Sequence, residues 1–180
     1  MKNIKYIILL LLTYNMTSAQ IAIGKESVSN TSVSLEFGSA NRGMVLPWVT
    51  SIAAVSSVRE GSLAYDLTDH KVKLKIAAGW KDMSGDPTGT TVDPLTNIDG
   101  VLIQDAATEN TGAKVAIGEP TSSTGILVLE DTNKAMVLPQ VASPHLNIIN
   151  PAPGMMVYDT TSNQLAFFNG KMWSFWKPSN

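Results

Sequence analysis

Alternation of apolar and polar residues runs through much of the chain after its first 19 residues. Residues 32–37 alternate with a period of two, which fits a half-buried strand, and residues 125–129 are more continuously apolar. Short apolar runs at residues 44–46 and 136–138 each stop at a proline, which belongs at the end or edge of a sheet. The pattern therefore predicts a mainly β protein.

The strongest local pattern lies near the C-terminal end of the sequence. Three short apolar segments separated by polar turns predict a three-stranded meander: residues 155–158, 164–168 and 171–175. Asn169-Gly170 separates the last two segments, and this dipeptide favours a type I′ turn with positive φ at both centres. Residues 63–83 follow the same plan. Residues 101–103 are a further apolar run, compatible with one extra strand.

The chain repeats itself. Residues 41–49 read NRGMVLPWV and residues 133–141 read NKAMVLPQV, and the flanking landmarks recur at offsets of 92 to 94 positions. Such self-similarity is typical of an architecture built from one repeated unit. Each copy is predicted to be a small β-meander module with one short helix, which begins in the second copy with Ser143 as N-cap and Pro144 at the first helical position.

The first residues have the pattern of a signal peptide. Lys2 and Lys5 precede an apolar run at residues 7–12, and small residues at 17–19 precede a cleavage site before Gln20. The apolar run is shorter than the roughly 20 residues of a membrane span, so no membrane span is expected after cleavage. We predict these divisions: signal peptide 1–19, β module 20–84, a linker rich in Gly, Pro and Thr at 85–112, and β module 113–180.

The order of motifs resembles the repeat of phage tail-fibre-like surface proteins of Gram-negative bacteria. That repeat reads roughly KGxLLPRMT followed by GLLVYDTTTN and a final NGTSW. Here AMVLPQV stands at residues 135–141, GMMVYDTTSN at 154–163 and NGKMW at 169–173. The resemblance implies a structural or adhesive fibre piece that forms trimers.

Charge argues against some partners. Removal of Lys2 and Lys5 with the signal peptide leaves 11 basic against 15 acidic residues, a net charge of −4. Nucleic acids and anionic lipids reward clustered Lys and Arg, so neither is expected as a partner. Lys71, Lys73 and Lys75 alternate with Val72 and Leu74, which predicts an amphipathic strand with a solvated lysine face.

Candidate chemistry is sparse, and we expect no enzyme, no cofactor and no metal site. The chain has no Cys, and His70 and His145 occupy non-equivalent places in the repeat. Asp66 and Asp159 recur at the same turn, where they are better interpreted as turn initiators than as paired carboxylates for glycoside cleavage. The sequence around 97–100 lacks the distal acidic residue of a calcium loop.

Tryptophans are the candidate contact residues. Trp80 and Trp173 are equivalent in the two copies and are first interpreted as core anchors of their hairpins. Trp48 has Gln140 as its counterpart and is the best single candidate for contact with a ligand or partner. Residues 159–161, with Thr160 at the centre, resemble a short acceptor for O-glycosylation.

The apolar load of each hairpin exceeds what a module of this size can hide alone. Either the two copies pack together or identical chains do, and the second alternative is favoured because the linker is expected to be flexible. We therefore expect an exported, self-associating structural or adhesive protein, with a trimer favoured, in the periplasm, at the cell surface or outside the cell. Surface glycans or proteins are further candidate partners. The alternative functions are a secreted carbohydrate-binding module that uses exposed aromatics and a hydrolase of surface glycans.

Overall fold

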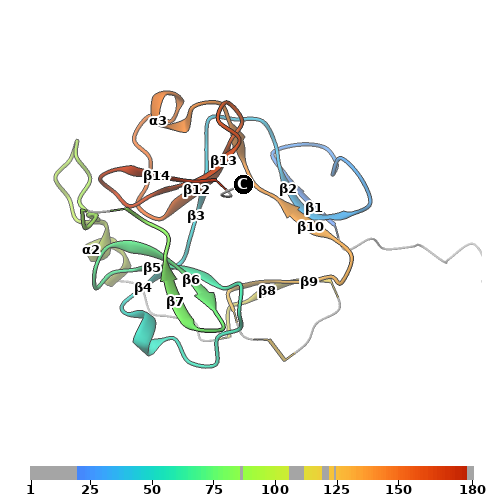
Figure 1. Cartoon of the computed structure of the whole chain (residues 1–180), viewed down its shortest axis with the longest axis horizontal. Helices are drawn as coiled ribbons and strands as arrows, with labels where there is room; N and C mark the ends of the chain where they lie inside the picture. Colours follow the sequence, from blue (N-terminus) through green and yellow to red (C-terminus); the bar gives the residue numbers. More distant parts are fainter. Residues whose placement is uncertain (1–19, 86, 106–111, 119–121, 124, 178–180) are drawn as a thin grey trace, which may run out of the picture.

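The computed structural model describes residues 20–85, 87–105, 112–118, 122–123 and 125–177 (Figure 1). The predicted signal peptide, residues 1–19, lies outside these ranges. Most of the described elements are short β-strands, so the prediction of a mainly β fold is confirmed. The boundaries of the two modules stay a prediction.

The two copies contain the same order of elements. The first copy is built from β1 (Ile21–Ile23), β2 (Val33–Phe37), β3 (Met44–Val45), β4 (Trp48–Val49), the 3₁₀ helix η1 (Ile52–Ala54), β5 (Leu63–Asp66), β6 (Lys71–Ile76) and β7 (Gly79–Asp82). The second copy is built from β8 (Val115–Gly118), β9 (Leu127–Glu130), β10 (Ala135–Val137), β11 (Gln140–Val141), α3 (Pro144–Asn147), β12 (Met155–Asp159), β13 (Gln164–Phe168) and β14 (Trp173–Trp176). Helix α2 (Gly100–Asp105) lies between the copies. The sequence repeat is therefore also a repeat of structure.

Unusual backbone angles recur at matching positions of the two copies. His70 and Asn163 both have φ of 54°, each in the turn between the first two strands of a meander. Ser57 and Asn150 likewise have φ of 57° and 52°. Left-handed backbone is uncommon outside glycine, and Asn and His tolerate it better than most residues. His70 thus occupies a turn position with left-handed backbone, equivalent to that of Asn163.

Each copy ends in the predicted antiparallel meander, with a short parallel strand beside it. β5, β6 and β7 form one meander next to β4, and β12, β13 and β14 form the other next to β11. Asp66 Oδ1 accepts from Thr68 N at 2.9 Å, and Asp159 Oδ1 accepts from Thr161 N at 2.9 Å. These bonds initiate the turns, as predicted for both carboxylates.

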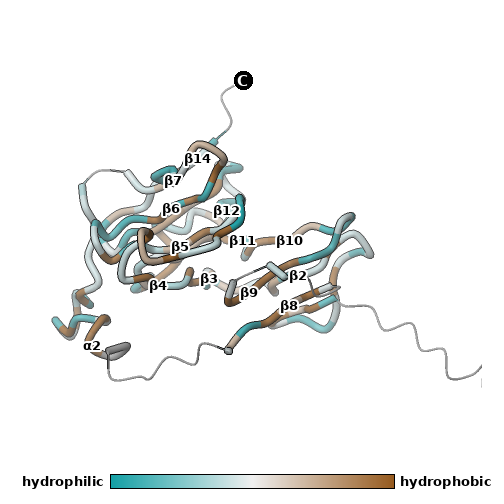
Figure 2. Tube along the Cα trace, turned by 90° about the horizontal axis from the view of Figure 1, so that it is seen from below, coloured by the Kyte–Doolittle hydropathy of each residue, from teal (hydrophilic) through white to brown (hydrophobic). Residues whose placement is uncertain are grey.

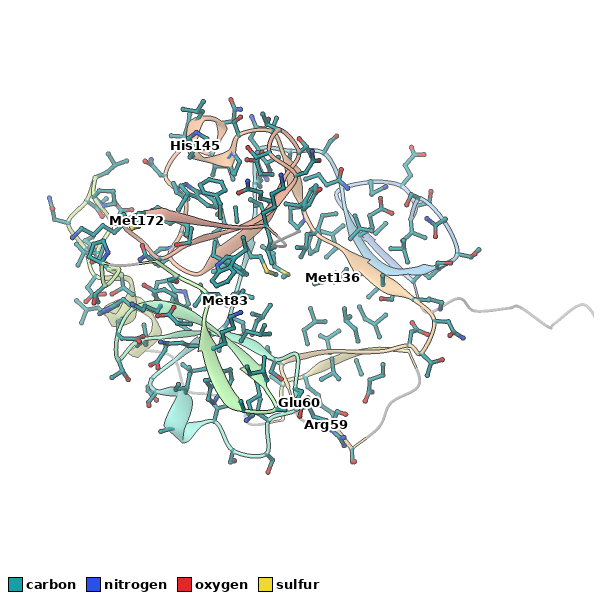
Figure 3. All side chains as sticks on the ribbon, in the orientation of Figure 1. Arg59, Glu60, Met83, Met136, His145 and Met172 are labelled. Atoms are coloured by element: carbon teal, nitrogen blue, oxygen red, sulfur yellow. The ribbon has the colours of Figure 1, made fainter. Side chains whose placement is uncertain are left out.

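The two meanders pack against each other within one chain. Their shared core contains Leu46, Tyr65, Val72, Met83, Met156 and Phe167, all buried. Figure 3, in which Met83 is labelled, shows the side chains of both copies filling the space between the sheets. The alternative in which the two copies pack together therefore holds for this face of the hairpins, while Met172 and Phe175 stay 37% and 39% exposed.

Two strands cross from one copy to the other (Figure 1). β3 of the first copy pairs antiparallel with β12 of the second, with Met44 beside Met156. β10 of the second copy pairs parallel with β2 of the first, with Met136 beside Leu35. The copies therefore share their sheets as well as their core.

The starts of the two copies form parallel strand pairs. β1 and β2 pair with Ile21 beside Leu35, and β10 completes a three-stranded sheet. β8 and β9 pair in the same way, with Val115 beside Leu127, but this sheet has only two strands among the described residues. Figure 2 shows β8 and β9 with mostly apolar residues, below the level of the meanders in that view.

Local details differ from the sequence expectations at three places. Residues 101–103 belong to helix α2, not to an extra strand. Asn169 lacks positive φ while Gly170 has φ of 92°, so the turn is not of type I′. Ser143 has a left-handed backbone and makes no side-chain cap bond to helix α3, although Pro144 stands at its start as predicted.

Candidate functional site

Trp48 bridges the two copies. Its Nε1 donates to Pro153 O at 2.9 Å, and its ring lies 5.7 Å from the Tyr65 ring, between centroids. A Cβ atom at Gly100 would lie 2.9 Å from the indole, so the start of helix α2 also packs against it. Gln140, its counterpart, is exposed on β11. Trp48 therefore makes contacts to the other copy and to helix α2 that its exposed counterpart Gln140 has no ring to make.

The other tryptophans lie on different strands and have separate neighbours. Trp80 on β7 is half-buried beside Lys75 on β6. Trp173 on β14 is also half-buried and lies 5.3 Å from the Phe168 ring. Trp48, Trp80 and Trp173 are therefore not assembled into one aromatic platform. Their role as contact residues stays a prediction.

Trp176 ties the C-terminal strand to the first copy. Its Nε1 donates to Met83 O at 2.6 Å, and Lys81 Nζ lies 4.7 Å from its ring centroid. Ser174 Oγ, two residues earlier, accepts from Gly85 N at 2.5 Å. Gly85, the first residue of the predicted linker, is thus hydrogen-bonded to strand β14.

Asn169 is the main polar connection that sequence reasoning missed. Its side chain is fully buried, its Oδ1 accepts from Lys171 N and Met172 N at 3.0 and 2.9 Å, and its Nδ2 donates to Pro87 O at 3.1 Å. Its carbonyl oxygen accepts from Tyr65 Oη at 2.8 Å and from Thr90 N at 3.1 Å. The Asn-Gly dipeptide was noticed as a turn, but nothing local indicates bonds to residues so distant in sequence.

Tyr65 is held at the centre of this junction. Its ring is fully buried in the shared core, and burial followed by the nearby charge of Asp69 raises the pKa of its hydroxyl. The hydroxyl therefore remains protonated and serves as the donor to Asn169 O. Tyr65 therefore has a structural role, because its hydroxyl makes a hydrogen bond from the first copy to the second.

The two repeated carboxylates are engaged in their own turns. Asp159 is buried, and burial alone would raise its pKa, but bonds from the backbone N–H groups of Thr161, Ser143 and Ser162 outweigh it and lower the pKa. Asp66 is buried in the equivalent turn of the other sheet. The carboxylates are fixed as acceptors and do not form the pair that glycoside cleavage requires.

Lysines of β6 are less solvated than predicted. Lys73 is buried, and its Nζ lies 2.5 Å from Asp69 Oδ2 and 3.7 Å from Asp82 Oδ2. Lys71 Nζ lies 3.0 Å from Asp82 Oδ2. The expectation of a solvated lysine face was therefore wrong for Lys73, because Asp69 and Asp82 of the same meander pair with its ammonium group.

The remaining candidate groups have structural surroundings. His145 is exposed on α3, with its ring 5.7 Å from that of Phe175. Asp99 Oδ1 accepts from Thr91 Oγ1 at 2.7 Å and from Val101 N at 3.0 Å, and these bonds lower its pKa. Thr160 is exposed in its turn, and its glycosylation stays a prediction. Within the described residues, no cluster of three or more His, Asp or Glu side chains could hold a metal ion.

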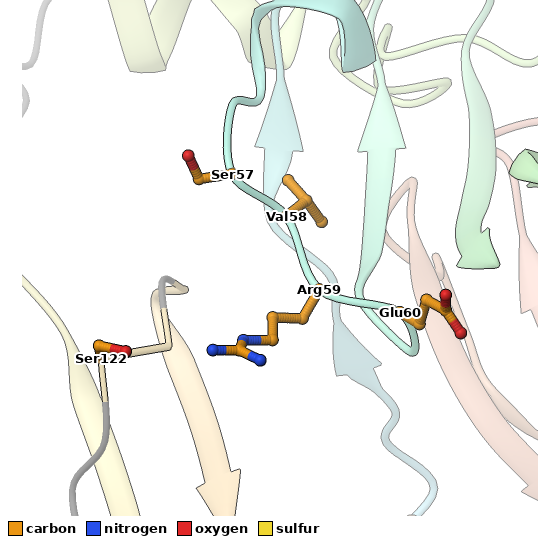
Figure 4. Close-up of a pocket in the computed structure, with 5 residues that line it drawn as sticks. All are labelled: Ser57, Val58, Arg59, Glu60 and Ser122. Carbon is orange, nitrogen blue, oxygen red and sulfur yellow. The ribbon is translucent and has the colours of Figure 1, made fainter. Parts of the chain in front are cut away.

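A surface hollow lies between the copies, lined by Ser57, Val58, Arg59, Glu60 and Ser122 (Figure 4). Arg59 extends toward Ser122, whereas Glu60 points away. Ligand pockets are usually enclosed by apolar walls with a few convergent polar groups. This hollow has only Val58 as an apolar side chain, so it is a poor small-molecule site.

The largest unexplained feature is exposed apolar surface. Such residues gather on β8 and β9 and the residue before β9, on helix α2 with its preceding loop, and around α3: Val115, Ile126, Leu127, Leu95, Ile98, Leu102, Leu146 and Ile149. Exposed apolar residues that gather in this way are typical of interaction surfaces. The continuous apolar run at residues 125–129 was the available sequence signal. No helix in the described part of the chain has the length and apolarity to cross a bilayer.

Residues 96–179 match the family model described as "Phage tail like trimerisation region". The match covers helix α2 and the whole second copy, and it supports a phage tail-fibre-like module there. No curated protein and no solved structure matches the chain. The family description is structural, and it supports self-association as a trimer.

Proposed function

We propose that this chain is an exported structural protein that forms a tail-fibre-like homotrimer and serves adhesion at a cell surface. The observation that carries the proposal is the match of residues 96–179 to a trimerisation region. The exposed apolar residues of the second copy lie within the same stretch and need a partner to cover them.

The chemistry of the described residues is consistent with a structural role. Buried polar groups such as Asn169 and Asp159 are committed to bonds that hold the two copies or their turns together. Export is supported by the signal-peptide pattern of residues 1–19, and adhesion by the resemblance to tail-fibre-like surface proteins.

The mass of the purified chain, residues 20–180, in solution tests the trimer. Light scattering after size exclusion, and sedimentation equilibrium over a wide range of concentrations, should give three times the chain mass. A stable, folded monomer at micromolar concentration contradicts the proposal.

Export is tested separately. The full chain, produced in a Gram-negative host, should be recovered outside the cytoplasm with Gln20 as its first residue. Recovery of only the uncleaved chain in the cytoplasm contradicts this part of the proposal, while leaving the trimer untouched.

A further inference from the structure

Each cross-copy pairing of strands is made once, although the repeat provides for it twice. β10 of the second copy lies parallel beside β2 of the first. Because β3 and β9 are the counterparts of β10 and β2, the equivalent pair would be β3 beside β9. That pair is not formed, and β8 is the only described strand that pairs with β9.

The missing strand has a measurable consequence for burial. Leu35 on β2 has 1% of its surface exposed, whereas its counterpart Leu127 on β9 has 41% exposed. The two leucines have the same place in their parallel pairs, beside Ile21 and Val115 respectively. The greater exposure of Leu127 accompanies the lack of a described third strand beside β9.

The open edge of β9 also lacks protection. Ile126 O accepts from Val115 N at 2.8 Å, and peptide groups alternate along a strand, so those of Leu127 and Leu129 point to the free edge. Natural proteins usually blunt such edges with charges or proline. On β9 the one charged residue is Glu130 at its C-terminal end, and residues 126–129, which are Ile, Leu, Val and Leu, carry neither.

β3 has the complementary property. Its only described partner is β12, which leaves its second edge unpaired, and Val45 is 47% exposed. Residues 44–47 and 136–139 have the same sequence, Met-Val-Leu-Pro. The segment that completes the first parallel sheet as β10 is therefore available a second time as β3.

We propose that the free edge of β9 takes β3 of a second copy of this chain as a parallel third strand. The register of β10 on β2 places Met44 beside Leu127 and Val45 beside Val128. Main-chain bonds of this kind give affinity, and alternate side chains give specificity. The inference rests on the proposed function and identifies the surface through which the chains associate.

This interface joins two different surfaces, so it is head-to-tail. Each chain offers one β9 edge and one β3 edge, and repetition of a contact of this type gives a closed ring where its rotation closes and an open filament where it does not. Three copies close the ring in the stoichiometry that the matched trimerisation region implies. No edge of either kind is left open in such a ring.

Crosslinking tests the register directly, because the chain has no cysteine. One chain carries Val45→Cys and a second, differently tagged chain carries Val128→Cys. The two are produced together and treated with a short bismaleimide. We expect a crosslinked pair that contains both tags, with neither chain alone giving that yield. The control chain carries Ala78→Cys, at an exposed position of the first meander, and should not crosslink to Val45→Cys.

A charged variant provides the second measurement. Leu127→Lys should leave the secondary structure and the monomer fold intact, because Leu127 is already partly exposed, and should shift the mass from trimer to monomer. A wild-type trimer with no crosslink at these positions, or a trimer unaffected by Leu127→Lys, overturns the interface while the proposed function stands. A wild-type monomer overturns both.

Discussion

The two meanders and the two parallel strand pairs differ in how completely their apolar residues are covered within one chain. Both meanders cover each other, so Tyr65 and Phe167 are buried within one chain. The parallel pairs are unequal, because β10 joins β1 and β2 as a third strand, while no described third strand joins β8 and β9. Duplication of a sequence therefore duplicates the strands but not their surroundings. The comparison assigns most of the monomer's core to the meanders and leaves β8 and β9 as the surface proposed for association.

Truncation in the meander core should have the largest effect. Phe167→Ala removes a buried ring between the sheets and should lower the free energy of unfolding by about 3–5 kcal/mol. Urea titration at one low protein concentration measures it, since association makes stability depend on concentration. The matched control, Phe175→Ala on the exposed side of β14, should cost clearly less. Equal losses would break the assignment of stability to the shared core.

Leu35 and Leu127 provide a matched test of the difference between the parallel strand pairs β1–β2 and β8–β9. Leu35→Ala should lower the free energy of unfolding of the dilute chain by about 2–5 kcal/mol, because Leu35 is buried in a completed sheet. Leu127→Ala should cost the dilute chain much less and instead weaken association. Urea titration and sedimentation of both variants separate the two effects. A similar loss of monomer stability for both would show that β9 is already covered.

Asn169 tests whether the junction of the meanders depends on polar contacts. Asn169→Ala leaves the N–H groups of Lys171 and Met172 and the carbonyl of Pro87 without their partner, and should cost about 1–3 kcal/mol. Asn169→Asp keeps an acceptor for the two N–H groups, but it buries a charge and turns an oxygen toward the Pro87 carbonyl, so its loss at neutral pH should be at least as large. Urea midpoints rank the variants, and the reverse order would contradict this account.

The smallest expected effect concerns acid. The folded-state pKa of Asp159 is lowered, so its contribution is present above the unfolded pKa of about 4 and is lost as the pH falls through the folded value. Asp159→Asn should therefore flatten the fall of stability below about pH 4. Urea midpoints of the variant and wild type across acidic pH measure the difference, and parallel curves would rule out this role.

Local features of the fold were predictable, and the connections between copies were not. The hairpins and the turn roles of Asp66 and Asp159 follow from short-range patterns, because each carboxylate bonds the backbone two residues ahead. The exchange of β3 and β10 has no local signal, since the same Met-Val-Leu-Pro segment pairs antiparallel in one copy and parallel in the other.

The sequence indicated individual residues of the candidate site but not the contacts between them. Trp48 was selected because its counterpart is Gln140, and the structure shows it bonded to Pro153 of the other copy. Asn169 was read as a turn residue, and its bonds to Pro87 and Tyr65 depend on a packing arrangement that no spacing reveals. The open edge of β9 is visible only after its neighbours are known.

The exchange of β3 and β10 has a consequence for how such a chain could arise. A chain with one copy could make the same exchange only by meeting another molecule, and dilution would undo it. Fusion of two copies makes that encounter intramolecular, with a local concentration set by the connecting segment and not by the abundance of the protein. Cleavage of the backbone between the copies should accordingly leave the two fragments bound to each other.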